Sequence, residues 1–178
     1  TSIQPIRMHK GIMMESIRIV GRSGHSSDPS LGSNALEAMN EMISALLLFR
    51  EKLQSEHSNG LFGVSMPTLN LGHIKGGDSP NRICGHCEMG FDLRPLPGMN
   101  TMALREELDF IVQRVAKKRG ITAQLVPLIE HVDPFQVDES ADLVSTCEAL
   151  TGRESGAVAF ATEAPFLSAL GLETIVMG

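Results

Sequence analysis

Two cysteines in the segment NRICGHCEMGFDLRP, residues 81 to 95, have the Cys-x-x-Cys spacing that thiol–disulfide oxidoreductases use. A reactive pair needs its attacking thiol at a helix N-terminus, where the helix dipole stabilises the thiolate. This segment instead alternates polar and apolar residues from Ile83 onward, which predicts a strand with Cys84 and Cys87 on opposite sheet faces. We therefore expect no disulfide between them, and interpret them as one buried and one partly exposed structural cysteine.

The polar positions at the two ends of this segment are candidates for binding a carboxylate. Asn81 lies in a Gly-rich turn and Arg94 stands at the end of the predicted strand. The planar guanidinium group of arginine fits a carboxylate, and an asparagine amide can both donate and accept hydrogen bonds. A solvated arginine and a turn asparagine would have the same spacing, so the residues alone leave both interpretations open.

Three further residues stand where a side chain can reach a ligand. His25, in RSGHSSDP, follows a predicted strand in a loop of small residues, although an ordinary surface histidine fits this position as well. Thr162 and Glu163, in FATEAPF, lie where a predicted strand passes into a helix, which suits either helix capping or ligand contact. No histidine stands at a metal-ligand spacing from another ligand, so the sequence predicts no metal site.

The elements that position these residues follow one another without a long interruption. Strands are expected at 15–21, 67–74, 83–95 and 121–127, and helices at about 35–53 and 101–120. The order β-α-β-β-α-β is that of the split βαβ, or ferredoxin-like, sandwich, an α/β (α+β) fold. The first helix is expected to bury Leu36, Met39, Ile43, Leu46 and Leu47, and the second Leu104, Leu108, Ile111, Val112 and Val115.

The remaining sequence does not complete a second domain. A helix with Ser140 as its cap, a buried strand over 156–161, a short helix and a last strand are expected after residue 137. Such a run cannot cover both faces of a parallel sheet. We interpret residues 11–130 as one complete domain, and residues 1–10 and 131–178 as an incomplete remnant of a larger α/β domain. The absence of an initial Met agrees with a processed piece of a longer protein.

The composition of the sequence disfavours binding to nucleic acids and insertion into a membrane. The net charge is −6, and the sequence has no Trp, no Tyr and 7 Phe, which disfavours nucleic-acid binding. No apolar run approaches the roughly 20 residues of a membrane helix, and no secretory signal opens the sequence. Three cysteines do not make a disulfide framework, so we expect a cytoplasmic protein.

Three stretches resemble the metallopeptidase M20 family, in the branch of the acetylornithine deacetylases: RIVGRSGHSSDPSLGSNALEAM, PTLNLGHIKGGDSPNRICGHCEMGFDLRPLPGM and ATEAPFLSALG. The resemblance implies a parent enzyme that hydrolyses N2-acetyl-L-ornithine to L-ornithine and acetate in arginine biosynthesis. It implies a catalytic domain that binds two zinc or cobalt ions, and an inserted ferredoxin-like lid, residues 11–130, that forms a homodimer. The family's metal ligands and glutamate base have no counterpart in this sequence, so the chain alone is expected to bind no metal and to be inactive.

The resemblance also implies roles for the candidate residues. His25 would reach the partner subunit's active site and donate to the scissile carbonyl as it becomes an oxyanion. Asn81 and Arg94 would hold the substrate carboxylate, and Thr162 and Glu163 would line the substrate pocket. From its charge, Glu163 is expected to pair with the ammonium group of ornithine.

Two alternatives remain open at this stage. The first is another M20 amidohydrolase, such as succinyl-diaminopimelate desuccinylase or an aminoacylase, in which the acyl-amino acid differs. The second is a stand-alone dimerisation or amino-acid-sensing module, because ferredoxin-like sandwiches often serve as regulatory domains.

Overall fold

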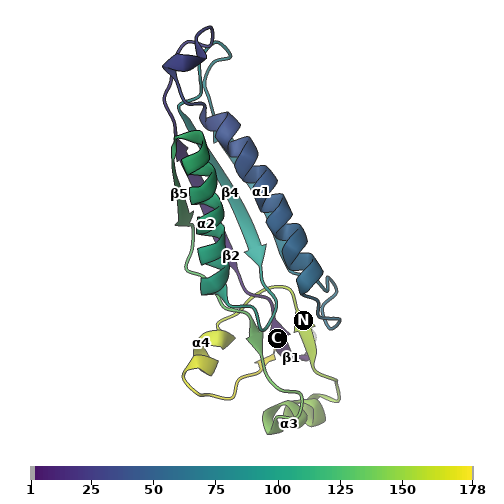
Figure 1. Cartoon of the computed structure of the whole chain (residues 1–178). Helices are drawn as coiled ribbons and strands as arrows, with labels where there is room; N and C mark the ends of the chain where they lie inside the picture. The colour runs from purple at the N-terminus through teal and green to yellow at the C-terminus, as the bar shows by residue number, and fades with distance from the viewer. Residues whose placement is uncertain (1–2, 178) are drawn as a thin grey trace.

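The computed structural model of the protein describes residues 3–177, which form an elongated lobe and a smaller base (Figure 1). We call the elongated lobe, residues 13–127, the lid. Each part is built around a four-stranded sheet, with the order β3-β4-β2-β5 in the lid and with β1 central in the base. The predicted mixed α/β fold is confirmed.

The lid sheet has the strand order of the split βαβ fold. Its strands are β2 (Met13–Val20), β3 (Thr68–Gly76), β4 (His86–Arg94) and β5 (Thr122–Pro127). All neighbouring strands are antiparallel, and Ile17 of β2 pairs with Met89 on one side and Leu125 on the other. The central strands are therefore β2 and β4, and β3 and β5 are edges.

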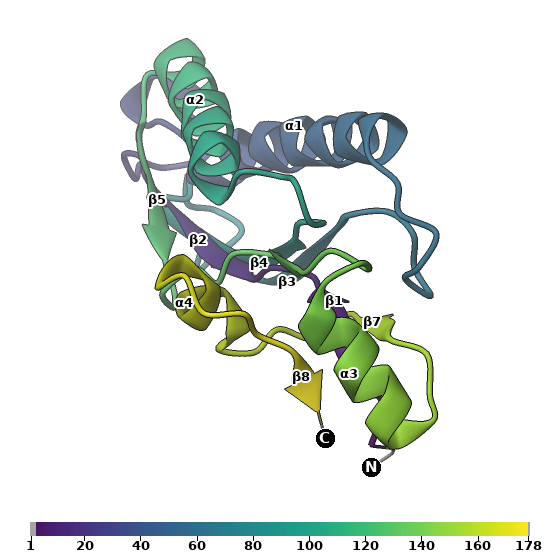
Figure 2. The same cartoon turned by 90° about the horizontal axis from the view of Figure 1, so that it is seen from below.

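Two helices, α1 (Ala35–Glu56) and α2 (Thr101–Arg119), cover one face of this sheet (Figure 2). Asn34 and Asn100 cap them, because each side chain accepts a hydrogen bond from a backbone N–H of the first turn. Gly120 ends α2 in the left-handed region at φ 62°, as predicted. The five apolar positions predicted for α2 are all buried.

The buried face of α1 differs in part from the predicted one. Met39 and Leu46 are fully buried, but Leu36 is 42% exposed. Ile43 and Leu47 are half-buried. Each residue turns a helix by about 100°, so these three side chains stand beside the buried stripe rather than on it. The stripe consists of Ala35, Ala38, Met39, Met42, Leu46, Phe49 and Leu53.

The cysteines are free, as predicted, but Cys84 does not lie on the polar face of the sheet. The strand β4 begins only at His86, so the alternation does not extend back to Cys84. The preceding backbone is bound elsewhere, with Ile83 N–H donating to the Gly24 carbonyl, 2.8 Å. Cys84 and Cys87 are both buried in the lid core, so the prediction of opposite faces and one partly exposed cysteine is wrong.

The base sheet is mixed. Its central strand β1 (Pro5–His9) runs antiparallel to β6 (Phe135–Gln136) and β8 (Val176–Met177), and parallel to β7 (Gly156–Val158). The sequence did not predict β1, and β7 is shorter than the strand expected over 156–161. Two helices, α3 (Asp142–Thr151) and α4 (Ala164–Ala169), follow the predicted order.

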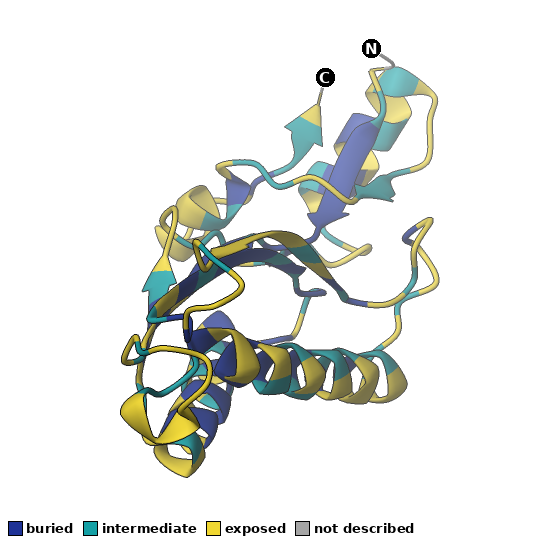
Figure 3. Cartoon of the chain, turned by 90° about the horizontal axis from the view of Figure 1, so that it is seen from above, coloured by how far each residue is buried: buried dark blue, intermediate teal, exposed yellow. Residues whose placement is uncertain are grey.

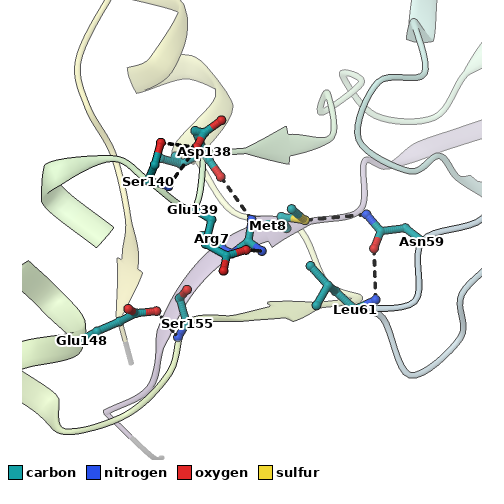
Figure 4. Close-up of polar contacts among 10 residues, drawn as sticks. Arg7, Met8, Asn59, Leu61, Asp138, Glu139, Ser140, Glu148 and Ser155 are labelled. Carbon is teal, nitrogen blue, oxygen red and sulfur yellow. Dashed lines mark hydrogen bonds and ion pairs between the residues drawn. The ribbon is translucent and has the colours of Figure 1, made fainter. Parts of the chain in front are cut away.

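The predicted cap of α3 is wrong. The backbone N–H and the hydroxyl of Ser140 both donate to Asp138 Oδ1, at 2.8 and 2.6 Å, which ties a turn ahead of the helix (Figure 4). The residue at the cap position is Ala141, which has no side-chain acceptor. The turn satisfies the serine locally, so its side chain is not available to the first helical amides.

Two crossings join the lid to the base. Ile12 and Val132 exchange both backbone hydrogen bonds, 2.8 and 3.0 Å, and Gly11 N–H donates to the Pro95 carbonyl, 2.9 Å. A Cβ atom on Gly11 would lie 2.7 Å from the Val132 carbonyl oxygen, so the close approach requires glycine. The exact domain limits at residues 11 and 130 stay a prediction. Buried residues are concentrated along β1 and the central lid strands β2 and β4 (Figure 3).

Candidate functional site

The loop that follows β2 contains the short 3-10 helix η1 (Pro29–Leu31) and lies at the tip of the lid beside the loop between β3 and β4 (Figure 1). His25 lies in the first loop and Asn81 in the second. Ser26 N–H donates to the Asn81 carbonyl, 3.0 Å, and His25 forms an isolated antiparallel bridge with Arg82. The side chains of His25 and Asn81 are both exposed. The fold therefore brings two of the predicted site residues together on neighbouring loops.

The hydrogen bonds of His25 assign its tautomer. The backbone N–H of Ser27 lies 3.2 Å from His25 Nδ1, and the Ser27 hydroxyl lies 2.7 Å from the same nitrogen. A backbone N–H can only donate, so Nδ1 must be the acceptor of the neutral ring. The proton of this tautomer then resides on Nε2.

Arg94 lies at the opposite end of β4 from the tip. The strand has nine residues, His86 to Arg94, which at about 3.3 Å per residue separates its ends by roughly 25 Å. Within one chain, Asn81 and Arg94 therefore cannot contact the same small ligand. The structure does not bring this predicted pair together.

The guanidinium group of Arg94 is partly engaged. Its Nε donates to Asp92 Oδ2 at 2.8 Å, and its side chain is 23% exposed. Among the contacts of residues 3–177, no other hydrogen bond holds this group, so its two terminal nitrogens can still receive an anion. The other Asp92 oxygen, Oδ1, is buried and has no partner in the same part of the chain.

Thr162 and Glu163 lie in the base, between β7 and α4. Thr162 Oγ1 accepts a hydrogen bond from Ala164 N–H, 3.2 Å, which ties a turn ahead of α4, whose cap residue is Glu163. Glu163 is exposed and makes no cap bond. Its carboxylate is thus free for another contact, while Thr162 is held by the backbone around it.

The sequence interpretation missed two buried polar residues beside this segment. His9 is 0% exposed and Lys10 is 2% exposed, at the crossing from base to lid. Thr162 N–H donates to His9 Nε2, 3.3 Å, which connects the predicted pocket segment to the crossing. Burial lowers the pKa of His9 and of Lys10, because both charged forms lose hydration. The run PIRMHKG has no amphipathic period, so no local pattern marked these two residues.

No cluster of three or more His, Cys, Asp or Glu side chains is placed to hold a metal ion in the part of the chain that the structure describes. None of the helices over the same residues has the length and apolar character to cross a membrane.

The sequence matches the peptidase dimerisation domain of the M20 family over residues 7–120. The chain belongs to the M20 family. It is 44% identical over all of its 178 residues to acetylornithine deacetylase of Aliivibrio fischeri and covers 47% of that protein. The identity to acetylornithine deacetylase of Pectobacterium carotovorum is also 44%, with 46% of that protein covered. The M20 chain thus spans about half the length of these relatives, and the predicted resemblance is confirmed.

Solved structures agree with the M20 fold. A tripeptidase from Staphylococcus aureus superposes with a TM-score of 0.74 at 15% identity, covering 99% of this chain and 45% of that one. An aminopeptidase from Bacillus cereus superposes with a TM-score of 0.72 at 18% identity, covering 98% of this chain and 45% of that one. At such low identity the likeness shows the M20 fold alone.

Proposed function

We propose that a longer protein containing this chain is a cytoplasmic metal-dependent amidohydrolase that converts N2-acetyl-L-ornithine to L-ornithine and acetate in arginine biosynthesis. The identity to proteins named acetylornithine deacetylase extends over the whole chain and supports this activity. Two zinc or cobalt ions would be held by residues outside this chain, and would polarise the amide carbonyl and activate water. The 178-residue chain by itself is expected to be inactive.

The preset tautomer of His25 is the observation that supports the chemistry best. During amide hydrolysis the carbonyl oxygen gains negative charge, and a donor already aimed at that oxygen stabilises the transition state more than the substrate. Ser27 holds Nδ1 as an acceptor, so the donor of this exposed residue is Nε2–H. His25 can therefore donate a hydrogen bond from Nε2 without changing its tautomer.

The separation of Asn81 and Arg94 supports a site shared by two subunits. One carboxylate can contact both residues only if they come from different copies of the chain. A homodimer formed by the lid would place His25 and Asn81 of the partner subunit over a site that contains Arg94, Thr162 and Glu163. Arg94 would bind the substrate carboxylate, and Glu163 would pair with the ornithine ammonium group.

Single substitutions in the full-length enzyme test these roles. His25→Ala is expected to lower kcat by about 100- to 1,000-fold with little change in KM, since an oxyanion donor acts where charge develops. Arg94→Ala is expected to raise KM chiefly, because the substrate carboxylate is already charged in the ground state. His86→Ala, an exposed histidine of the lid, is the control and should leave both constants near those of the unmodified enzyme.

Mixing the two variants, with activity measured at substrate concentrations far below KM, where both homodimers are impaired, tests the shared site. A heterodimer of a His25→Ala subunit with an Arg94→Ala subunit has one site that lacks both residues and one that has both. Activity should therefore return after subunit exchange. If exchange is confirmed by mass spectrometry and no activity returns, the cross-subunit role of His25 is wrong.

A substrate series separates the proposal from the alternatives. The enzyme should prefer N2-acetyl-L-ornithine over N-succinyl-diaminopimelate and over acetylated amino acids with apolar side chains. Glu163→Gln should weaken that preference by removing the charge opposite the ammonium group. A sensing module would instead bind ornithine to the isolated chain without metal, which calorimetry would detect.

A further inference from the structure

The ring of His9 lies at the end of β1 and contacts three segments. It packs against Phe135 of β6, with ring centroids 5.2 Å apart and planes tilted by 32°. Its Nδ1 lies 2.9 Å from the Lys10 carbonyl oxygen, and its Nε2 lies 3.3 Å from the backbone N–H of Thr162. The ring is 0% exposed to solvent.

These two contacts are compatible with one protonation state only. The Lys10 carbonyl can only accept, so Nδ1 must carry a proton, whereas the Thr162 N–H can only donate, so Nε2 must be unprotonated. The neutral Nδ1–H tautomer satisfies both contacts. A protonated ring, or the other tautomer, would place two hydrogens between Nε2 and Thr162. Burial lowers the pKa of His9, which agrees with a neutral ring.

Lys10 ties the same point of the backbone to the lid. Its ammonium group donates to the carbonyl oxygens of Val64 and Met66, at 2.9 and 2.6 Å, in the loop between α1 and β3. The ammonium nitrogen also lies 5.6 Å from the centre of the Phe62 ring. The backbone here is also held by Lys10 N–H donating to the Val158 carbonyl of the base, 3.3 Å, and by Gly11 N–H donating to the Pro95 carbonyl of the lid, 2.9 Å. The residue whose carbonyl accepts from the His9 ring is therefore attached to the lid at two points.

We propose that His9 is a positioning residue that couples the base of the lid to the Thr162–Glu163 segment. The lid loop holds Lys10, Lys10 orients the His9 ring, and the ring fixes the backbone at Thr162. Displacement of the lid at this crossing would be transmitted to the segment that carries Glu163. The coupling itself rests only on the contacts above, and its catalytic consequence rests on the proposed function.

Two near-isosteric substitutions separate the ring's donor from its acceptor. His9→Asn keeps an N–H near the position of Nδ1 but removes the acceptor at Nε2. His9→Gln places a carbonyl oxygen near the position of Nε2 and so keeps an acceptor for Thr162. A role in packing alone would affect both variants alike.

Nuclear magnetic resonance of the 178-residue chain provides the test. At neutral pH the ring ¹⁵N shifts should show Nδ1 protonated and Nε2 unprotonated. Hydrogen exchange at the Thr162 backbone N–H should accelerate about ten-fold in His9→Asn, because its hydrogen bond to the ring is lost. In His9→Gln the exchange rate should stay within about two-fold of that in the unmodified chain. Exchange at Leu108, in the core of the lid, should not change. A protonated Nε2, or equal acceleration in both variants, would overturn the proposal.

Lys10→Met tests the other half of the coupling. Removing the ammonium group should accelerate exchange at Thr162, although Lys10 makes no side-chain contact with it, whereas Lys52→Met should not. Unchanged exchange in Lys10→Met would show that the lid loop does not position the ring. In the full-length enzyme, His9→Asn should raise KM several-fold more than His9→Gln. If exchange responds as expected and KM does not, the coupling stands and the substrate role of the Thr162 segment is wrong.

Discussion

Lys10 keeps a cation inside the protein by bonding to uncharged partners. Two carbonyl oxygens accept from its ammonium group, and the face of Phe62 lies on a third side. Burial lowers the pKa of Lys10 because hydration of the charged form is lost, and these contacts replace part of that hydration. Lys10 is therefore expected to contribute to stability through its contacts rather than through a carboxylate.

Lys10→Met should lower the free energy of unfolding by about 1.5 to 3 kcal/mol, since hydrogen bonds from a charged donor are lost while the apolar stem is kept. Lys52→Met makes the same chemical change at an exposed ion pair with Glu107, and should cost less than about 1 kcal/mol. Urea unfolding of both variants checks this. Equal losses would contradict the structural role of Lys10.

The lowered pKa of His9 predicts a dependence of stability on pH. The ring has an ordinary pKa of 6.5 in the unfolded chain and a lower one when folded. Between these two values the unfolded chain binds one proton more, so the free energy of unfolding decreases as the pH falls below 6.5 and levels off below the folded pKa. In His9→Gln this part of the slope should vanish. An unchanged slope between pH 6.5 and 5, measured by urea titration, would show that His9 is not the group responsible.

At the scale of elements, α1 is held by one continuous stripe of side chains. The stripe runs from Ala35 to Leu53 and includes small and flexible residues that a search for large aliphatic residues passes over. Ala38 permits a close approach to the neighbouring elements, and Met42 can adapt its shape to them. The buried face of the helix thus includes Met39 and Leu46 as predicted, but not Leu36.

Leu46→Ala and Leu48→Ala should have different effects although they lie two positions apart. Leu46 is 0% exposed, and its truncation should cost about 2 to 5 kcal/mol through lost burial and a residual cavity. Leu48 is 66% exposed, so its truncation should change stability by less than about 0.5 kcal/mol. Thermal and urea unfolding of the pair would reveal whether the buried stripe is assigned correctly.

The end of α2 is held by a backbone conformation that favours glycine. Gly120 has φ 62°, and no atom lies within 4 Å of the position that its Cβ would occupy. Gly120→Ala should therefore cost about 1 kcal/mol through strain alone. Gly60 also has open space but no positive φ, so Gly60→Ala should be neutral or raise stability by up to about 1 kcal/mol. Similar values for both would argue against strain at Gly120.

At the scale of the whole molecule, the lid is a dimerisation domain with two open sheet edges. The edges are β3 and β5, whose outer backbone groups have no partner strand within residues 3–177. An unpaired edge either needs protection or pairs with a second chain. A closed two-fold dimer would satisfy one edge in each copy.

The chain is expected to sediment as a dimer at micromolar concentration. Ile74→Lys places a charge on β3, where Ile74 is 49% exposed, and Thr122→Lys does the same on β5. The variant that dissociates identifies the edge that pairs. A monomer at high concentration of the unmodified chain would contradict dimerisation by this lid, and a dimer unaffected by either variant would place the interface away from the edges.

The sequence by itself determined the order of the lid elements, the buried face of α2 and its end at Gly120. These features follow from patterns within a few residues, since strand alternation and helix periodicity are local. It also located the candidate residues on loops and element ends, as the structure finds for His25 and Asn81. The roles assigned to the five site residues stay predictions.

Only the tertiary structure decided the features that depend on segments far apart in the sequence. Cys84 is buried because its backbone is bound beside Gly24 and Ala35, not by its own alternation. The distance between Asn81 and Arg94 is set by the length of β4, which no motif records. His9 and Lys10 carry no local signal, because their partners, Thr162 and the carbonyl oxygens of the 57–67 loop, come within reach only when lid and base have folded against each other.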